Sequence, residues 1–456
     1  MVGALEKHLA LIGFMGAGKS TIGREVAERT QRPFVDTDDE IERRHGSIPE
    51  LFDRGEPEFR SVEEEIVAEA LAGPDSVIAL GGGAVLSPRT RERLEARAFT
   101  VHLAVEVEDA WERVRGSDRP LAQSENDFRR LHESRQGLYA ETAGAFARSV
   151  DEVLLGALSI RVGNGQRPAL EGPAALVADE HVLGLYQFEL GGTTHQVPAG
   201  EAAKTADVVE RLLTELELGR DGTIVAFGGG STTDVAGFAA ATYLRGIDWI
   251  AMPTTLVGQV DAAIGGKTGI DLEQGKNLVG AFHFPQQVVI DPTFLATLPE
   301  AERRNGMAEV VKTGLLGGED VWALPEEEMI RACAAFKAGI VLSDPYEREG
   351  RRTILNLGHT FAHALETGSG YRVSHGEAVA LGLLAALRLS AQSTDVVEEV
   401  LRPQAAQADP DAAWAAMKRD KKGEGVFVLL EGPGRPVVTT VPDHDARTAL
   451  NALIAK

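Results

Sequence analysis

Residues 8–21 read HLALIGFMGAGKST, an apolar run that passes into a glycine-rich turn and then into Lys19 and Ser20. The segment fits the pattern G-x-x-x-x-G-K-[ST], and it lies between a strand-like run and a helical pattern, as that motif requires. Glycines let successive backbone N–H groups converge on phosphate oxygens, and the N-terminus of the following helix adds partial positive charge. The stretch therefore predicts a phosphate cradle between a parallel strand and a helix.

The positions of this cradle have distinct expected roles. Lys19 would reach the transferring phosphoryl group, and the Ser20 hydroxyl would ligate Mg²⁺. The contacts to the nucleotide are expected from Gly13, Gly16, Gly18, Lys19, Ser20 and Thr21. A chance glycine-rich turn is the alternative, and the Lys-Ser pair in the correct context argues against it.

The chain as a whole is acidic and has the apolar content of a globular protein. Its 456 residues carry a net charge of −23 with 43% apolar residues, and this length favours two or three domains. An acidic chain without a basic face is a poor partner for nucleic acid or an anionic membrane. The start of the sequence does not read as a signal peptide, so we expect a cytoplasmic enzyme. With Cys333 as the only cysteine, an intrachain disulfide and a zinc site built from cysteines are excluded.

Strand-like apolar runs alternate with helical patterns from residue 8 to about residue 150, which is typical of a parallel sheet covered by helices. The same alternation resumes at residues 174–179, and beyond residue 300 the pattern is mainly helical, with a period near 3.6. Residues 157–173 interrupt the alternation with Gly-Asn-Gly and Arg-Pro, and we interpret them as a linker. The expected domains are therefore residues 1–156, 174–300 and 301–456.

Further motifs in the first domain concern the acceptor of the phosphoryl group. They are Asp36-Thr37-Asp38, Glu58-Phe59-Arg60, Gly81-Gly82-Gly83, Arg119-Pro120-Leu121, and Arg135 shortly before Leu138-Tyr139. With these motifs the chain resembles shikimate kinase over nearly all of residues 7–155. The resemblance implies ATP- and Mg²⁺-dependent phosphorylation of shikimate to shikimate 3-phosphate, with Arg119 as a catalytic residue in a lid over ATP. The arginine that stacks on adenine is left open between Arg113 and Arg115.

The chemistry of these side chains agrees with a small hydroxy acid as the acceptor. Asp38 can orient the attacking hydroxyl and take its proton, and Asp36 is expected near Mg²⁺. Arg60 and Arg135 can hold a carboxylate by paired hydrogen bonds, while the triple glycine lets the backbone approach the ring. Another small-molecule P-loop kinase is the alternative, and the set of Asp38, Arg60 and Arg135 argues against it.

Two segments in the second half carry chemistry of their own. Residues 223–246, TIVAFGGGSTTDVAGFAAATYLRG, read as strand, glycine turn and helix, which suits a pyrophosphate; without G-x-G-x-x-G spacing, an ordinary structural turn explains them equally well. Residues 355–377 supply three histidines, and the spacing of His359 and His363 by itself nominates both as metal ligands on one helix face, with a third from elsewhere. Glu309 and Lys312 lie one turn apart on another expected helix.

More motifs surround these segments. They are Pro198-Ala199-Gly200-Glu201 with Lys204, Gly228-Gly229-Gly230 with Asp234, Arg245, Pro253-Thr254-Thr255, Asp261, Gly265-Gly266-Lys267, Gly275-Lys276-Asn277, Glu309 with Lys312, Arg352, Asn356, the histidines His359, His363 and His375, and Asp420-Lys421-Lys422. With them the chain resembles 3-dehydroquinate synthase from about residue 174 to the C-terminus. The resemblance implies NAD- and metal-dependent conversion of 3-deoxy-D-arabino-heptulosonate 7-phosphate to 3-dehydroquinate, with release of phosphate.

The second resemblance also implies roles for single residues. Its zinc or cobalt ligands are Glu309, His359 and His375, whereas spacing alone favours His363. We follow the resemblance, because two histidines and a carboxylate leave an open position for a substrate hydroxyl. His363 then lies near the substrate phosphate. The residues implied for NAD are Glu201, Lys204, Gly228, Gly229, Gly230, Asp234, Thr254, Thr255 and Lys276.

The residues implied for the substrate of this second enzyme are Arg245, Asp261, Lys267, Asn277, Lys312, Arg352, Asn356 and His363. Among them Lys267, Lys312 and His363 are expected to be catalytic, and Arg245 to reach in from a second subunit of a homodimer. Which of Lys421 and Lys422 meets the substrate is left open.

Two alternatives oppose the second assignment. A metal-dependent polyol or alcohol dehydrogenase shares the glycine turn, but neutral alcohols have no use for Arg245, Lys267, Lys276 and Lys312 together. A regulatory ATP- or NAD-binding module is opposed by the intact set of reactive side chains. The resemblances thus imply an α/β chain with a P-loop kinase domain, a Rossmann-like NAD-binding domain and a mainly helical metal-binding domain. Together they would catalyse two steps of the shikimate route on small anionic substrates.

Overall fold

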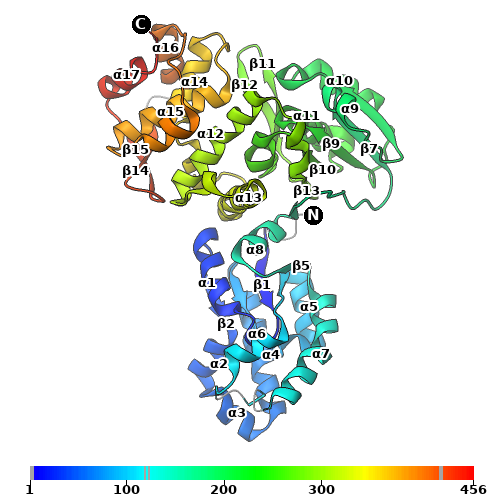
Figure 1. Cartoon of the computed structure of the whole chain (residues 1–456). Coiled ribbons are helices and arrows are strands. Elements are labelled where there is room, and N and C mark those ends of the chain that lie inside the picture. Colours follow the sequence, from blue (N-terminus) through cyan, green and yellow to red (C-terminus); the bar gives the residue numbers. More distant parts are fainter. Residues whose placement is uncertain (1–4, 118–119, 122–123, 421–424, 456) are drawn as a thin grey trace. The chain divides into compact units, whose positions relative to one another are not determined.

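The computed structural model describes residues 5–117, 120–121, 124–420 and 425–455. The chain forms two compact units, drawn in Figure 1: the first comprises residues 1–160 with 338–343, and the second residues 161–337 with 344–456. No helix within the described ranges is both long and apolar enough to cross a membrane.

The first unit is built on a five-stranded parallel sheet with the strand order β2-β3-β1-β4-β5. Its strands are β1 (His8–Ile12), β2 (Phe34–Asp36), β3 (Val77–Ala79), β4 (Ala98–Leu103) and β5 (Ala145–Ala147). Its helices are α1 (Lys19–Thr30), α2 (Thr37–His45), α3 (Ile48–Arg54), α4 (Glu56–Ala72), α5 (Pro88–Arg97), α6 (Val107–Val114), α7 (Glu125–Thr142) and α8 (Val150–Ala157).

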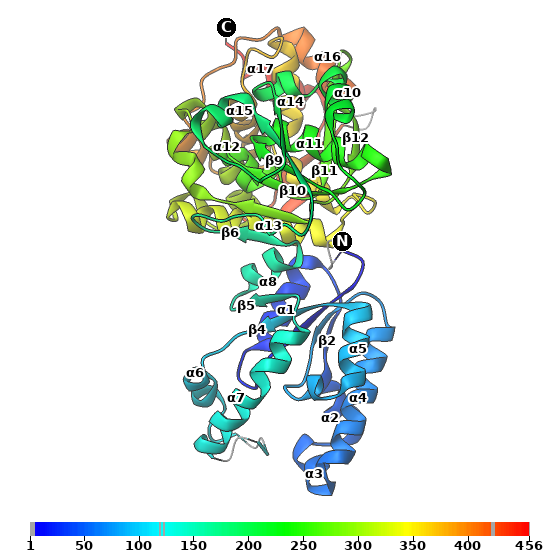
Figure 2. The ribbon, with the colours of Figure 1, turned by 90° about the vertical axis from the view of Figure 1, so that its right-hand side faces the viewer.

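Right-handed crossovers place these helices on the two faces of the sheet. The chain moves one way along the sheet from β1 to β2 and the other way from β2 through β3 and β4 to β5, so α1 lies on the face opposite α4, α5 and α7. Helix α8 contacts α1 (Figure 2). The wholly buried β1 ends at the glycine loop, and the carboxyl ends of β2 and β3 bring their polar loops to the same edge.

The second unit begins with a six-stranded sheet of order β6-β13-β10-β9-β7-β8. The strands are β6 (Ile160–Val162), β7 (Ala174–Asp179), β8 (Thr193–Val197), β9 (Thr223–Gly228), β10 (Asp248–Pro253) and β13 (Gln287–Ile290), with an antiparallel hairpin formed by β11 (Lys267–Leu272) and β12 (Gly275–Phe282). The associated helices are α9 (Glu180–Leu185), α10 (Ala206–Glu215) and α11 (Gly230–Thr242). Helix α11 follows β9 directly and packs on β10 and β11, so its N-terminus meets the ends of the central strands.

The remainder of the second unit is mainly helical, as its sequence pattern predicts. It contains α12 (Glu300–Gly317), α13 (Glu326–Ser343), α14 (His359–Gly368), α15 (His375–Leu389), α16 (Pro410–Asp420), α17 (Asp443–Asn451) and the hairpin of β14 (Val426–Leu430) and β15 (Pro436–Thr440). Residues 338–343, the last of α13, are the ones counted with the first unit. Helix α15 packs against α12 and α14 around one apolar core. This packing brings the N-terminal turns of α14 and α15 to the middle of α12.

Candidate functional sites

The glycine loop of the first unit has the backbone geometry of a phosphate cradle. Gly13, Gly16 and Gly18 have φ angles of 146°, 83° and 85°, which side chains disfavour. A Cβ on Gly13 would also lie 2.6 Å from the backbone oxygen of Leu103. Lys19 Nζ donates hydrogen bonds to the carbonyls of Gly13 and Phe14 at 2.9 and 3.1 Å, so the ammonium lies over the loop. Ser20 and Thr21 follow in the first turn of α1.

A cavity of about 300 Å³ adjoins this loop. It collects nearly every acceptor-site residue expected from the sequence: Ser20, Asp36, Asp38, Arg60, Gly81, Gly82, Gly83 and Arg135. Asp36 also has a structural role, because its Oδ1 caps α2 by accepting from the N–H groups of Asp38 and Asp39 at 3.0 and 3.5 Å. The structure thus brings the two expected carboxylates, Asp36 and Asp38, and the two expected guanidinium groups to one cavity.

The triple glycine makes room for the charged side chains of this cavity. A Cβ on Gly83 would lie 2.1 Å from Arg60 Nη1, and one on Gly81 would lie 2.6 Å from both Asp38 Oδ1 and Glu63 Oε1. Arg60 Nη1 donates to Glu63 Oε2 at 2.7 Å. Burial raises the pKa of Glu63, against the opposing effect of Arg60. The buried Glu63 therefore fixes the position of the Arg60 guanidinium by a hydrogen bond.

Arg135 is buried on α7 beside the same turn. Its Nη1 donates to the carbonyl of Gly82 at 3.2 Å, and the hydroxyl of Tyr139 donates to the same oxygen at 2.6 Å. Its Nε has no hydrogen-bond partner among the described residues, and leaving a buried guanidinium N–H unpaired is costly. The arrangement suits an anionic ligand such as a carboxylate.

The lid residues are only partly described. Arg119 lies outside the described residues. Arg113 Nη1 donates to the carbonyl of Gly16 in the glycine loop at 2.9 Å, whereas Arg115 Nη2 pairs with Glu112 at 2.8 Å. Of the two arginines that the sequence left open, Arg113 is thus in contact with the loop.

The second unit contains a cavity of about 1170 Å³ that extends from the glycine turn after β9 to the N-terminus of α15. The expected cofactor residues that line it are Glu201, Gly229, Gly230, Asp234, Thr254, Thr255 and Lys276. Asp261, Asn277, His363 and His375 line it as well. The cavity therefore joins the expected dinucleotide and substrate residues in one space.

The buried Lys204 connects two of the expected site residues, Asp234 and Asn277. Its ammonium donates to Asp234 Oδ2 at 2.8 Å and to Asn277 Oδ1. Burial raises the pKa of Asp234 to about 6, although Lys204 acts against this. The lysine thereby ties α11 to the hairpin of β11 and β12, while Gly228 ends β9 just before the turn.

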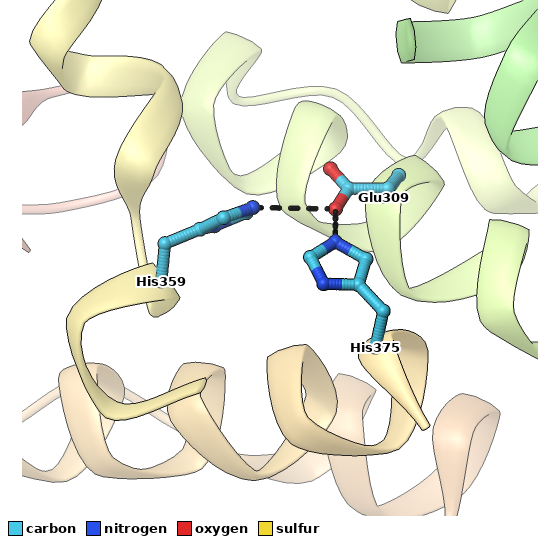
Figure 3. A group of neighbouring side chains, drawn as sticks. All are labelled: Glu309, His359 and His375. Carbon is cyan, nitrogen blue, oxygen red and sulfur yellow. Dashed lines mark hydrogen bonds and ion pairs between the residues drawn. The ribbon is translucent and has the colours of Figure 1, made fainter. Parts of the chain in front are cut away.

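Three side chains from separate elements form a group with metal-ligand character (Figure 3). Glu309 on α12, His359 on α14 and His375 on α15 each offer one ligand atom, and these atoms lie within 4.8 Å of one another. The Nε2 atoms of His359 and His375 are 3.4 and 3.3 Å from the same oxygen, Glu309 Oε1. His363 faces the large cavity and does not belong to the group.

The electrostatics of the group suit a cation. Burial opposes the charge on Glu309, but Lys312 and His359 outweigh it and hold the pKa of Glu309 well below its usual range. Burial and Lys312 lower the pKa of His359. Burial opposes the charge on His375, but Glu309 and Glu366 outweigh it and raise the pKa of this imidazole to about 10. A divalent metal requires a deprotonated carboxylate and neutral imidazoles, so zinc or cobalt bound by these three residues would take the place of the proton on His375.

A row of buried ion pairs extends from Glu309 into the second unit. Lys312 forms an ion pair with Glu309 and lies 3.8 Å from Asp261 Oδ1, which is 2.8 Å from Lys337 Nζ. Burial opposes the ionisation of Asp261, but the two lysines outweigh it and lower its pKa. Burial lowers the pKa of Lys337. The sequence analysis missed Lys337, since a lone lysine inside a helical pattern has no distinguishing signal.

Other expected substrate residues do not line the cavity in this structure. Lys267 is exposed and pairs with Glu347 at 2.8 Å. Arg352 is buried and donates to the carbonyls of Gly265 and Pro345, and its Nε has no hydrogen-bond partner among the described residues. Asn356 is exposed at the end of the 3₁₀ turn that carries Arg352.

Arg245 lies in an exposed turn of unusual backbone. Leu244 and Arg245 have φ angles of 50° and 69°, a region that costs a non-glycine residue roughly 1–2 kcal/mol. Lys421 and Lys422 lie outside the described residues.

Two further residues that line the cavities could not be found from motifs. Asp179 caps α9 through the N–H groups of His181 and Val182, and it lines the large cavity beside the glycine turn. Glu63 follows Arg60 by one turn of α4. Their positions along the chain were the available signal. Asp179 is an acidic residue at the end of an apolar strand, and Glu63 is a glutamate three residues after a site arginine.

Comparisons with known proteins cover both units. A shikimate kinase family model matches residues 15–153, and models of the N- and C-terminal parts of 3-dehydroquinate synthase match residues 194–305 and 306–423. A bifunctional shikimate kinase/3-dehydroquinate synthase of Thermotoga maritima is 36% identical over 412 residues, which cover 82% of this chain and 83% of the relative.

Two solved structures resemble the second unit. A 2-deoxy-scyllo-inosose synthase, in complex with carbaglucose-6-phosphate, NAD⁺ and Co²⁺, is 26% identical with a TM-score of 0.54, over 61% of this chain and 90% of that one. The 2-epi-5-epi-valiolone synthase of Streptomyces hygroscopicus, with NAD⁺ and Zn²⁺ bound, is 26% identical with a TM-score of 0.55, over 66% of this chain and 92% of that one.

Fold and sites together define a two-enzyme chain, in which a P-loop kinase precedes an α/β synthase with a metal-ligand group. The matches identify both halves. The chain belongs to the family of bifunctional shikimate kinase/3-dehydroquinate synthases.

Proposed function

We propose that the first unit transfers the γ-phosphoryl group of ATP to shikimate through the residues around the 300 Å³ cavity. Asp38 orients the attacking hydroxyl and takes its proton, while Arg60 and Arg135 hold the substrate carboxylate. The loop N–H groups, Lys19 and Arg119 stabilise the charge on the transferring phosphoryl group. Mg²⁺, with Ser20 as ligand and Asp36 nearby, would neutralise the phosphates. The convergence of Asp38 with both arginines on one cavity supports this assignment.

We propose further that the second unit converts 3-deoxy-D-arabino-heptulosonate 7-phosphate to 3-dehydroquinate. The group of Glu309, His359 and His375 is the observation that carries this proposal. Zinc or cobalt held there would polarise a ring hydroxyl, and NAD⁺ on the glycine turn would take up a hydride and later return it. Lys312 keeps Glu309 charged, and His363, which lines the cavity, would serve the departing phosphate.

The remaining substrate residues would bind the two anionic groups of the substrate. We assign the carboxylate and phosphate to Lys267, Asn277, Arg352 and Asn356, with Asp261 holding Lys312 in place. Lys267 and Arg352 would have to turn towards the cavity when substrate binds. We also assign Arg245 to the site of a second copy in a homodimer, because a backbone of positive φ holds this side chain exposed at the surface.

The functional domains follow from the same reasoning. We propose a kinase domain at residues 1–156, a linker at 157–173, an NAD-binding domain at 174–300, and a metal- and substrate-binding domain at 301–456, in a protein that resides in the cytoplasm. Cell fractionation and sedimentation of the purified chain test the location and the homodimer.

The central experiment supplies each substrate separately to the purified chain. We expect ATP- and Mg²⁺-dependent phosphorylation of shikimate, and NAD-dependent release of phosphate from the heptulosonate phosphate. Stripping tightly bound metal from the chain and then restoring Mg²⁺ should abolish only the second reaction, and Zn²⁺ or Co²⁺ should restore it. A chain with a single activity would refute one half of the assignment.

A further inference from the structure

Glu366 is a buried carboxylate that none of the proposed catalytic steps uses. It lies on α14, seven residues after His359, so the two side chains project from the same face of the helix. Its Oε1 is 3.3 Å from Nδ1 of His375 on the neighbouring helix α15. One face of α14 therefore contributes two residues here. His359 is a member of the metal-ligand group, and Glu366 contacts another member, His375.

The two nitrogens of His375 face two different carboxylates. Nε2 points to Glu309 Oε1, within the ligand group, while Nδ1 points to Glu366 Oε1 outside it. His359 is arranged in the same way, with Nε2 towards Glu309 and Nδ1 donating to the carbonyl of Leu357 at 3.2 Å. In each imidazole, Nδ1 thus has an acceptor outside the ligand group, and Nε2 is the nitrogen that faces the other ligands and could bind a metal.

The surroundings of Glu366 keep it available for this contact. The side chain is buried, and a buried carboxylate requires charged or hydrogen-bonding partners. Apart from His375, the ammonium of Lys276 lies 3.9 Å from the same oxygen, and it also lies over the ring of Tyr371 at 5.2 Å. Lys276 belongs to β12, so Glu366 lies between the metal-ligand group and the cofactor side of the cavity.

We propose that Glu366 is a positioning residue of the metal site: it accepts the Nδ1 hydrogen of His375, fixes the tautomer and ring orientation that present Nε2 to the metal, and so raises metal affinity. This inference rests on the proposed metal site of Glu309, His359 and His375. A carboxylate that orients a metal-bound imidazole in this way typically contributes 10- to 100-fold to metal affinity.

The test compares metal binding by the full chain and its Glu366→Gln variant after chelator treatment. We expect Zn²⁺ affinity, measured by competition with a chromophoric chelator, to fall roughly 10- to 100-fold, and the visible absorption band of bound Co²⁺ to shift. Glu366→Asp, which keeps the charge, should recover part of the affinity. Glu377→Gln is the matched control, because this exposed glutamate on α15 loses the same charge but contacts Ser374 rather than His375.

Two readouts separate positioning from a structural role. Shikimate phosphorylation by the same samples should be unchanged, which shows that the first unit of each variant is intact, and the far-ultraviolet circular dichroism of the metal-free chains should match that of the unmodified chain, which shows that the second unit is folded. The thermal unfolding of the metal-free proteins should differ little, whereas the stabilisation gained on adding Zn²⁺ should be smaller for Glu366→Gln. An unchanged metal affinity and Co²⁺ spectrum in Glu366→Gln would overturn the inference, as would an equal loss of stability with and without metal.

A Glu309→Ala variant distinguishes the two levels of the argument. If it binds metal as tightly as the unmodified chain, the proposed metal site itself is wrong. If it loses the metal while Glu366→Gln keeps full affinity, the site stands and only the role of Glu366 is refuted.

Discussion

The absence of a Cβ atom at Gly83 leaves room for the side chain of Arg60 in the kinase cavity. A Cβ at this position would lie 2.1 Å from Arg60 Nη1, the far end of a flexible side chain. We therefore expect Gly83→Ala to displace Arg60 without unfolding the chain, and to raise the KM for shikimate roughly 10- to 100-fold, the value of a lost charged hydrogen bond. Steady-state kinetics of the kinase measure this.

Gly137→Ala is the matched control for Gly83→Ala. Gly137 lies inside α7 of the same unit, and a Cβ there would have no atom within 4 Å. Alanine is the better helix former by about 1 kcal/mol, so this variant should keep its KM and gain stability. An equal rise in KM in both variants would show that the effect is not local to Arg60.

His102 gives the first unit a pH-dependent stability. Its burial in β4, with smaller effects of His132 and Lys19, lowers its pKa to about 4 from the usual 6.5. Between these values the unfolded chain binds a proton that the folded chain does not, so the free energy of unfolding falls as the pH drops from 6.5 towards 4. The loss should approach about 3 kcal/mol.

The measurement compares urea unfolding of the full chain with that of His102→Leu between pH 4.5 and 7.5, with kinase activity as the probe of the first unit. The stability of the unmodified protein relative to the variant should decrease towards acid. A difference that stays constant with pH would contradict a neutral, buried His102.

At the same scale, the residues that the sequence could predict differ in kind from those it could not. Lys19 and Asp38 belong to runs of adjacent motif residues, so their chemistry is visible in the chain itself. Glu63, Lys337 and Glu366 contact neighbours on other elements or other turns, and only helix packing makes those neighbours known. His363 shows the converse, because its i, i+4 spacing indicated a metal ligand, whereas the packing of α15 brings His375 rather than His363 next to Glu309 and His359.

At the scale of elements, the loop after α13 depends on one carboxylate. The two oxygens of the buried Asp344 accept the backbone N–H groups of Arg348, Glu349 and Arg351. Glu347, the partner of Lys267, and Arg352 flank this arrangement. In Asp344→Asn an amide would face one of these N–H groups, so we expect a loss of about 1–3 kcal/mol and a severalfold higher KM for the heptulosonate phosphate.

Glu349→Gln tests whether charge or loop structure is responsible. This exposed residue of the same loop forms an ion pair with Arg351 at 2.7 Å, and such surface pairs contribute at most about 1 kcal/mol. Its kinetics and thermal unfolding should stay close to those of the unmodified chain. Similar losses in both variants would refute a special role of Asp344.

The elements themselves were largely predictable, because the alternation of buried strands with amphipathic helices recurs along the chain. The segment expected as a linker shows the limit of such patterns. Residues 160–162 form β6, and the N–H groups of Gly165 and Ala169 donate to the side chains of Asp291 and Gln287. A strand of three residues has too few positions for an alternation to be visible, and side-chain bonds across more than 100 residues leave no local signal.

At the scale of the whole molecule, the question is whether the two enzymes influence one another. The product of the synthase, 3-dehydroquinate, is not shikimate, so other reactions must lie between the two steps. Each cavity is lined by residues of one unit alone. Coupling between the sites would require a change in one unit that alters binding in the other, and it would be reciprocal.

We therefore predict that inactivating either site leaves the other intact. Lys19→Ala should lower shikimate phosphorylation at least 100-fold, because the ammonium acts on the transferring phosphoryl group, while phosphate release by the synthase stays within about twofold. Glu309→Ala should do the reverse, because it removes a metal ligand. Both rates are measured on the same preparations, and the double variant should combine the two losses without further effect, as independent sites require. If Lys19→Ala slows the synthase, or if saturating shikimate and ATP change its KM, the units are coupled, and the fusion serves regulation as well as joint production.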